Sequence, residues 1–118
     1  MSAAAHALGS EAVVEPSARH RSVLLREALS WLRPVPGGAY VDATLGAGGH
    51  AEALLEASAP DGRVLGLDRD PGALALARER LGRFGDRFTA VHADHGDLLE
   101  AARGAGFFAV DGILADLG

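Results

Sequence analysis

Apolar positions along the chain follow two different spacings. Helical spacing over residues 19–34 places five side chains on one stripe: Leu24, Leu25, Ala28, Leu29 and Leu32. This stripe predicts an amphipathic helix that Pro34 ends, and we expect it, together with Trp31, to lie in the core or at a subunit contact. Nearly continuous apolar runs predict strands at 39–44, 63–68, 87–94 and 110–117, separated by helix-like segments at 49–59, 72–81 and 98–106.

Turn and cap residues support this division. Asp70 stands before Pro71 at the start of one predicted helix, and Asp97 stands before another. Strands that alternate with helices form parallel pairs with right-handed crossovers, and their apolar character on both faces predicts a doubly wound sheet. The fourth strand coincides with the end of the chain. We therefore expect an α/β fold truncated after the fourth strand, with one flank of that strand uncovered.

The first residues have a different composition. Residues 1–19 are rich in alanine, lack a basic leader and contain Glu11 and Glu15. This composition predicts a disordered N-terminal tail and not a signal peptide. Residues 20–118 are then the cofactor-binding half of one domain. The sequence has no apolar run long enough for a membrane span, so we expect a cytoplasmic protein without membrane contact.

Composition excludes some chemistry. The chain has 118 residues and no cysteine, so it has neither a disulfide framework nor a thiolate nucleophile or metal ligand. With 11 basic and 16 acidic residues its formal net charge is 11 − 16 = −5. That charge gives no general attraction to nucleic acid, although it leaves room for a local basic patch.

A glycine turn after the first predicted strand carries the main chemical signal. The letters GAGGHA at 46–51 fit the pattern G-x-G-x-x-A, and Asp68 follows Gly48 by about 20 residues, at the end of the next strand. Such a turn lets a ligand approach the backbone, and the carboxylate accepts hydrogen bonds from both hydroxyls of a ribose. The pattern predicts an adenosine-containing cofactor. The alternative is an ordinary turn with a helix cap at Asp68 or Asp70.

Neighbouring acids favour one cofactor over another. Asp42 precedes the glycines, where a carboxylate can face the α-amino group of S-adenosylmethionine but would gain nothing from the pyrophosphate of NAD. Asp94 or His95, after the third strand, could border an adenine pocket. The alternatives are a strand-end hydrogen-bonding role for Asp42 and a cap role for Asp94. A metal site in the HADH segment is not expected, because His92 and Asp94 share a strand face that His95 does not.

Five segments carry a family resemblance: HRSVLL, YVDATLGAGGH, GRVLGLDRDPGAL, RFTAVHAD and VDGILADLG. Over residues 19–118 they resemble the bacterial ribosomal RNA small-subunit methyltransferase H family, the cytosine-N4 methyltransferases of 16S rRNA. The resemblance implies a Rossmann-like class I methyltransferase fold, S-adenosyl-L-methionine as cofactor and 16S rRNA in the small ribosomal subunit as partner. It further implies that six residues contact the cofactor: Gly48, Gly49, His50, Asp68, His95 and Asp116.

Two departures from the family pattern stand out. The family usually has phenylalanine where this chain has His95, so stacking on adenine would be weaker. The family also continues well past the DLG letters that end at Gly118. The expectation is therefore an N-terminal fragment of the methyltransferase that is inactive by itself.

The reaction demands an acceptor for the amine of cytosine and alignment of its nitrogen with the methyl group. Asp116, at the end of the fourth strand, is suitably placed, but the resemblance assigns it to the cofactor. The catalytic residue is therefore left unassigned. Two other functions stay open on the sequence alone: a nucleotide-binding domain of an NAD-dependent oxidoreductase, and a cofactor-binding fragment without catalysis.

Overall fold

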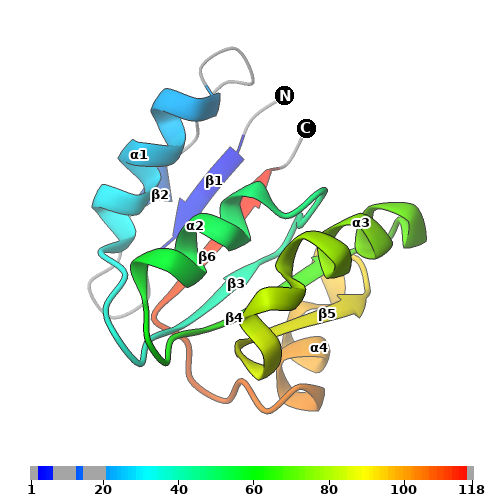
Figure 1. Ribbon diagram of the computed structural model, residues 1–118. Coiled ribbons are helices and arrows are strands. Elements are labelled where there is room, and N and C mark those ends of the chain that lie inside the picture. Colours follow the sequence, from blue (N-terminus) through cyan, green and yellow to red (C-terminus); the bar gives the residue numbers. More distant parts are fainter. Residues whose placement is uncertain (1–2, 7–12, 15–20, 117–118) are drawn as a thin grey trace.

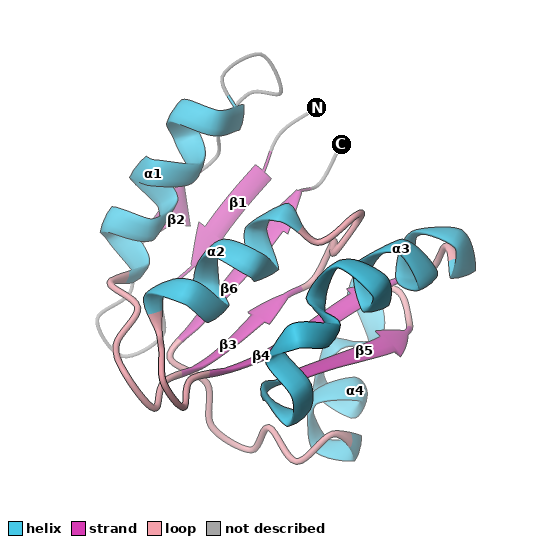
Figure 2. Cartoon of the chain, in the orientation of Figure 1, coloured by secondary structure: helices cyan, strands magenta, loops and turns pink. Residues whose placement is uncertain are grey.

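A computed structural model describes residues 3–6, 13–14 and 21–116 of the chain. Its centre is a six-stranded sheet in the order β2-β1-β6-β3-β4-β5, with helices on both faces (Figures 1 and 2). The elements in chain order are β1 Ala3–His6, β2 Val13–Val14, α1 Arg21–Leu32, β3 Ala39–Asp42, α2 Gly49–Ala57, β4 Arg63–Asp68, α3 Pro71–Leu81, the 3-10 helix η2 Gly82–Arg87, β5 Phe88–His92, the 3-10 helix η3 His95–Asp97, α4 Leu98–Gly104 and β6 Gly112–Asp116.

The four strands expected from the apolar runs are confirmed as a parallel set. Val41 of β3 pairs with Ile113 of β6 on one side and with Leu65 of β4 on the other. The chain moves outward from β3 to β4 and β5, and then returns to place β6 on the opposite side of β3. This reversal creates a switch point between β3 and β6, where open α/β sheets bind their ligands.

Two strands near the N-terminus correct the sequence-based expectation. β1 pairs with β6 in antiparallel register, with Ala5 opposite Leu114, and β2 pairs with β1. The prediction of disorder is wrong for Ala3–His6 and Val13–Val14, and the rest of 1–19 lies outside the described residues. The predicted uncovered flank of β6 is also wrong. A strand in this position satisfies backbone N–H and C=O groups that an edge would leave unpaired.

Alternating side chains of the strands divide the core into two layers. Tyr40 and Val64 face a cluster built with α1, α2 and α3, whereas Val41 and Leu65 face a second cluster built with α4. This alternation follows from the two-residue period of a strand. Figure 1 shows the same division, with α2 and α3 in front of the sheet and α4 behind it.

Helix α1 packs through part of its predicted stripe. Ala28 is 1% exposed and Leu32 is 6% exposed, so both lie in the core as predicted. Trp31 is 56% exposed, so its placement in the core is wrong, and the subunit contact stays a prediction. With about 100° between successive residues, Trp31 lies well to the side of Leu32 and is carried off the face that meets the sheet. For Leu24 and Leu25 the structure describes the backbone and not the side chains.

The predicted helix caps have different outcomes. Asp70 caps α3 as expected, because its Oδ1 accepts a hydrogen bond from the backbone N–H of Gly72 at 2.9 Å. Asp97 occupies the cap position of α4 as predicted, but its side chain makes no capping hydrogen bond. Its backbone N–H instead donates to the carbonyl of Asp94 at 2.9 Å, which closes the turn of η3.

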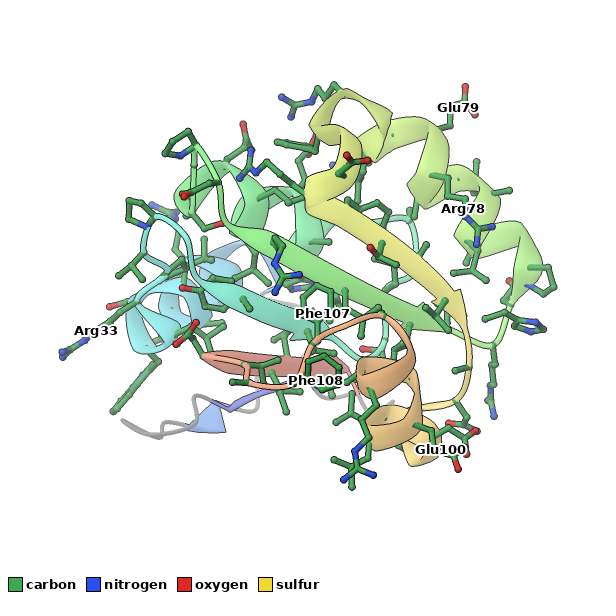
Figure 3. The ribbon with its side chains drawn as sticks, turned by 90° about the horizontal axis from the view of Figure 1, so that it is seen from below. Arg33, Arg78, Glu79, Glu100, Phe107 and Phe108 are labelled. Atoms are coloured by element: carbon green, nitrogen blue, oxygen red, sulfur yellow. The ribbon has the colours of Figure 1, made fainter. Side chains whose placement is uncertain are left out.

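The loop between α4 and β6 completes the second layer. Phe107 is 4% exposed and lies under the guanidinium of Arg63, 4.6 Å from its carbon to the ring centre. Phe108, next in the chain, is 82% exposed (Figure 3). Phe107 belongs to the same buried cluster as Ala102 of α4, so it helps this short helix to cover the sheet. None of the helices in the described parts of the chain has the length and apolar character that a membrane-crossing helix needs.

Candidate functional site

The carboxyl ends of the parallel strands bring the predicted site residues to one edge of the sheet. Strand β6 ends at Asp116, β3 at Asp42, β4 at Asp68 and β5 at His92. Sheet order places these four ends next to one another in that sequence. Loops that follow such ends form the ligand-binding crevice of open α/β sheets.

The glycine turn between β3 and α2 adopts the backbone geometry that glycine favours. Gly46 has φ +55° and Gly48 has φ +95°, both in the left-handed region. A Cβ atom on Gly46 would meet no atom within 4 Å, whereas one on Gly48 would lie 3.0 Å from Cδ1 of Leu81 in α3. The space beside Gly46 is therefore open, and the lack of a side chain at Gly48 allows α3 to pack against the turn.

Gly46 is a candidate contact that the predicted contact set omits. Its signal was present in the sequence, since Gly46 is the first glycine of the G-x-G-x-x-A pattern. The pattern does not tell which glycine faces a ligand and which faces the interior. Gly49 begins α2, and a Cβ on it would be in ordinary contact with Nη1 of Arg80, at 3.8 Å.

Asp68 joins the glycine turn to the loop after β4. Its Oδ2 accepts a hydrogen bond from the N–H of Gly46 at 2.8 Å, and its Oδ1 accepts one from the N–H of Asp70 at 2.9 Å. Each carboxylate oxygen has two lone-pair directions, so both keep capacity for hydroxyl donors. The helix cap of the ordinary-turn alternative is present at Asp70 and not at Asp68.

Asp42 is buried at the switch point. It is 1% exposed, and its Oδ1 accepts a hydrogen bond from the N–H of Thr44 at 3.2 Å. The strand-end hydrogen bond considered for this residue is therefore present, and a contact with a cofactor amine stays a prediction. His50, the second residue of α2, is half-buried beside the same turn.

Asp94 and His95 follow β5 and pair with each other. The Nδ1 atom of His95 lies 2.9 Å from Oδ1 of Asp94, and Nη1 of Arg69 lies 3.9 Å from Oδ2 of Asp94. Asp94 occupies the cap position of η3, but its side chain makes no capping hydrogen bond. Its carboxylate instead contacts His95 and Arg69. The described residues contain no cluster of three or more His, Cys, Asp or Glu suited to a metal ion.

The structure describes the backbone of Asp116 only. It ends β6, opposite Ala3 of β1, and its side chain lies outside the described residues. The predicted contact of Asp116 with the cofactor stays a prediction.

Helices α2 and α3 are joined beside the glycine turn by an ion-pair network. Glu52 of α2 lies 2.9 Å from Nη2 of Arg80 and 3.0 Å from Nη2 of Arg83. Hydrogen bonds from Arg80 and then Arg83 hold the pKa of Glu52 below its ordinary value. Because α2 begins at the turn, this network helps fix the position of the turn relative to α3.

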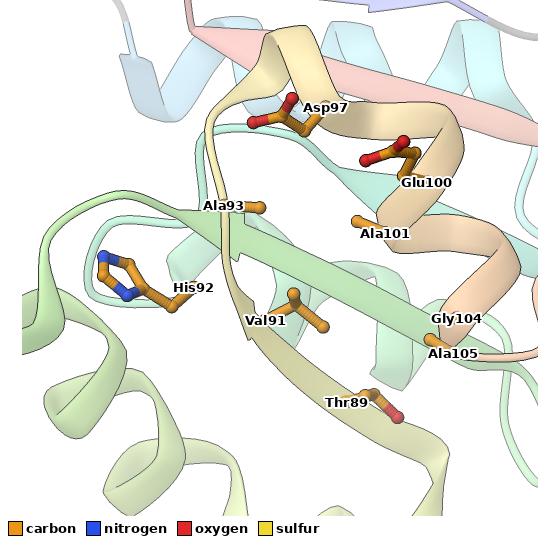
Figure 4. Close-up of a pocket in the computed structure, with 9 residues that line it drawn as sticks. All are labelled: Thr89, Val91, His92, Ala93, Asp97, Glu100, Ala101, Gly104 and Ala105. Carbon is orange, nitrogen blue, oxygen red and sulfur yellow. The ribbon is translucent and has the colours of Figure 1, made fainter.

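A groove of about 560 Å³ lies elsewhere, between β5 and α4 (Figure 4). It is lined by residues of both elements, among them Thr89, Val91, Ala101 and Glu100. The glycine turn and Asp68 do not line it. The groove also includes His92 and Ala93, so it reaches the carboxyl end of β5 at the same edge of the sheet.

A parallel set of strands with this switch point, a glycine turn and an acid after the next strand defines a Rossmann-like domain of the class that binds adenosine-containing cofactors. Solved structures agree with this fold. A Clostridium thermocellum protein described as a candidate rRNA methylase is 26% identical, with a TM-score of 0.60 over 64% of this chain and 43% of its own. The precorrin 8w decarboxylase of Methanobacterium thermoautotrophicum is 26% identical, with a TM-score of 0.58 over 71% of this chain and 43% of its own.

The chain belongs to the MraW methylase family, whose model matches residues 17–118. The ribosomal RNA small subunit methyltransferase H of Trichlorobacter lovleyi is 52% identical over 99 residues, which are 84% of this chain and 32% of that protein. The protein of the same name from Thermomicrobium roseum is 51% identical over 102 residues, which are 86% of this chain and 31% of that protein. The chain thus spans about a third of the length of these relatives.

Family membership confirms the resemblance read from the five sequence segments. Because this is a methylase family, the NAD-dependent oxidoreductase alternative is set aside. The roles of individual residues toward the cofactor, which the resemblance implies, stay proposals.

Proposed function

We propose that the chain forms the S-adenosylmethionine-binding part of a cytoplasmic methyltransferase that modifies the N4 amine of a cytosine in 16S rRNA of the small ribosomal subunit. Membership of the methylase family supports methyl transfer, and the names of the relatives support ribosomal RNA as the substrate class. One observation carries the cofactor assignment. The backbone of Gly46 and the carboxylate of Asp68 meet at 2.8 Å, at the strand ends.

The residues at this edge fit an adenosine cofactor. The open space over Gly46 admits a ligand close to the backbone, and Asp68 keeps acceptor capacity for two ribose hydroxyls. Gly48, Gly49 and His50 continue into the first turn of α2, whose N–H groups favour electron-rich ligand atoms. When bound, S-adenosylmethionine supplies an electrophilic methyl group on a sulfonium.

The chain's residues can therefore bind and orient the cofactor. Asp68 would hold the ribose, and the imidazole of His95 would border the adenine, where its pairing with Asp94 limits its rotation. Asp116, across the switch point, would contact the other end of the cofactor. No described side chain is assigned as the acceptor of the cytosine amine, so the catalytic residue stays unassigned.

Calorimetry with three ligands tests the cofactor. We expect saturable binding of S-adenosylmethionine and of S-adenosylhomocysteine, and no saturable binding of NAD. Binding of NAD with neither of the other two would overturn the proposal.

The methylated position needs a separate experiment. Small ribosomal subunits that lack the modification are incubated with the protein and methyl-labelled S-adenosylmethionine, and the rRNA is then digested to nucleosides. Label on N4 of cytidine supports the proposed reaction. Label confined to another nucleoside, or to ribosomal protein, would contradict it.

A further inference from the structure

The loop that follows β4 is tied to the end of β5 by neighbouring polar contacts. The backbone N–H of Ala93 lies 3.1 Å from the carbonyl oxygen of Asp68 and donates to it. The Nε2 atom of His92 lies 2.8 Å from the carbonyl oxygen of Arg69. These contacts hold the carbonyl groups of the two peptide bonds on either side of Arg69, so they restrain the backbone next to Asp68.

His92 is directed to this loop by the alternation of β5. Thr89, Val91, His92 and Ala93 all border the groove, but the imidazole of His92 points away from Val91 and toward the loop between β4 and α3, where its Nε2 reaches the carbonyl of Arg69 (Figure 4). The carbonyl of Arg69 can only accept, so Nε2 carries the proton and donates. Both the neutral Nε2–H tautomer and the imidazolium can make this bond.

We propose that His92 is a positioning residue for the cofactor's ribose: by holding the Arg69 carbonyl, it fixes the loop that presents Asp68. This inference rests on the proposed function. His92 acts through Arg69 and does not itself touch the cofactor. The Asp68 carboxylate receives N–H donors from Gly46 and Asp70, and the His92 contact restrains the same loop from the side of β5.

Two substitutions separate the hydrogen bond from the bulk of the ring. His92→Phe keeps a planar ring but removes the hydrogen-bond donor. We expect it to weaken S-adenosylhomocysteine binding by about 3- to 10-fold, because this is the change in affinity that corresponds to the free energy of one neutral hydrogen bond. His92→Gln places an amide N–H near the position of Nε2 and should stay within about twofold of the unchanged chain. His92 is exposed, so both variants should keep the fold, which circular dichroism checks.

A double-mutant cycle with Asp68→Ala distinguishes positioning from general support of the structure. If His92 acts through Asp68, then His92→Phe should have no further effect on binding once the carboxylate is gone. Equal losses in both backgrounds, or unchanged binding by His92→Phe alone, would overturn the positioning role while leaving the proposed function intact. Failure of the unchanged 118-residue chain to bind S-adenosylhomocysteine would overturn the proposed function, and the inference with it.

Discussion

The backbone N–H of Gly46 donates a hydrogen bond to Oδ2 of Asp68 at 2.8 Å, although the two residues belong to successive strand–helix turns. This contact means that the carboxylate has a structural partner before any ligand binds. Its loss therefore affects the turn and the cofactor together, and the two effects can be measured separately.

Replacement of Asp68 by alanine should weaken binding of S-adenosylhomocysteine by roughly 10- to 150-fold. A carboxylate that accepts hydroxyl hydrogen bonds contributes about 1.5–3 kcal/mol, and alanine removes it. The N–H groups of Gly46 and Asp70 also lose their acceptor, so the melting temperature should fall. Calorimetry gives the affinity and thermal unfolding gives the stability.

Asp86→Ala is the matched control, because Asp86 is an exposed aspartate of η2 away from the strand ends. It should change neither the affinity nor the melting temperature. Unchanged affinity in Asp68→Ala would show that the ribose is held elsewhere.

Alanine at Gly46 and at Gly48 should have different consequences. Both positions have positive φ, which costs a non-glycine residue about 1–2 kcal/mol. At Gly48 the new Cβ also lies 3.0 Å from Leu81, and overpacking adds about 1–3 kcal/mol. We expect Gly48→Ala to lose more stability in urea unfolding.

Gly46→Ala should keep the fold but lose at least about tenfold in cofactor affinity, because its Cβ occupies the open space through which a ligand reaches the backbone. An unchanged cofactor affinity in Gly46→Ala would contradict the proposal that the ligand contacts the backbone at this position.

The packing of Gly66 inside β4 also affects the glycine turn after β3. A Cβ on Gly66 would lie 2.6 Å from Cδ1 of Leu45, the residue before Gly46. Gly66→Ala should therefore displace Leu45 and destabilise the fold by about 1–3 kcal/mol, with weaker cofactor binding as a second effect. Gly82→Ala is the control, since Gly82 has helical φ and a Cβ there meets no atom within 4 Å. That control should be neutral or stabilising by up to about 1 kcal/mol. Equal stability of the two variants in urea unfolding would contradict the packing argument.

The Glu52 network predicts a pH-dependent contribution to stability. Hydrogen bonds from Arg80 and Arg83 lower the pKa of Glu52 in the folded state, so the unfolded state binds more protons as the pH falls below the unfolded pKa of about 4.3. The stabilisation is thus present above that pH and is lost as the pH falls through the folded pKa. At pH 7, Glu52→Gln should cost about 0.2–1 kcal/mol, because these side chains are partly exposed.

The measurement is urea unfolding of Glu52→Gln and of the unchanged chain at several pH values. Their difference should shrink below about pH 4.3. Glu79→Gln, an exposed glutamate of α3, serves as the control for a loss of charge alone. A difference that grows as the pH falls would contradict the assigned direction of the pKa.

The sequence by itself determined the parallel strands, their helices and the family. The apolar interior of 63–68 predicted β4, because a strand covered on both faces needs apolar residues in its interior, and the four central residues are buried. The Asp70–Pro71 pair fixed the start of α3 because both residues act locally, through a cap and a preset φ. The glycine pattern and Asp68 identified the site because their types and spacing are themselves the chemical signal.

Only the tertiary structure decided which neighbours each of these side chains contacts. It showed that Gly48 packs against Leu81 while Gly46 is open, and that Trp31 lies outside the core. It also placed Ala3–His6 beside β6, a pairing between segments at opposite ends of the chain. Local spacing determines which elements form. The neighbours of each side chain depend instead on how those elements pack, and the contact of His92 with the Arg69 carbonyl exists only because β5 lies beside the end of β4.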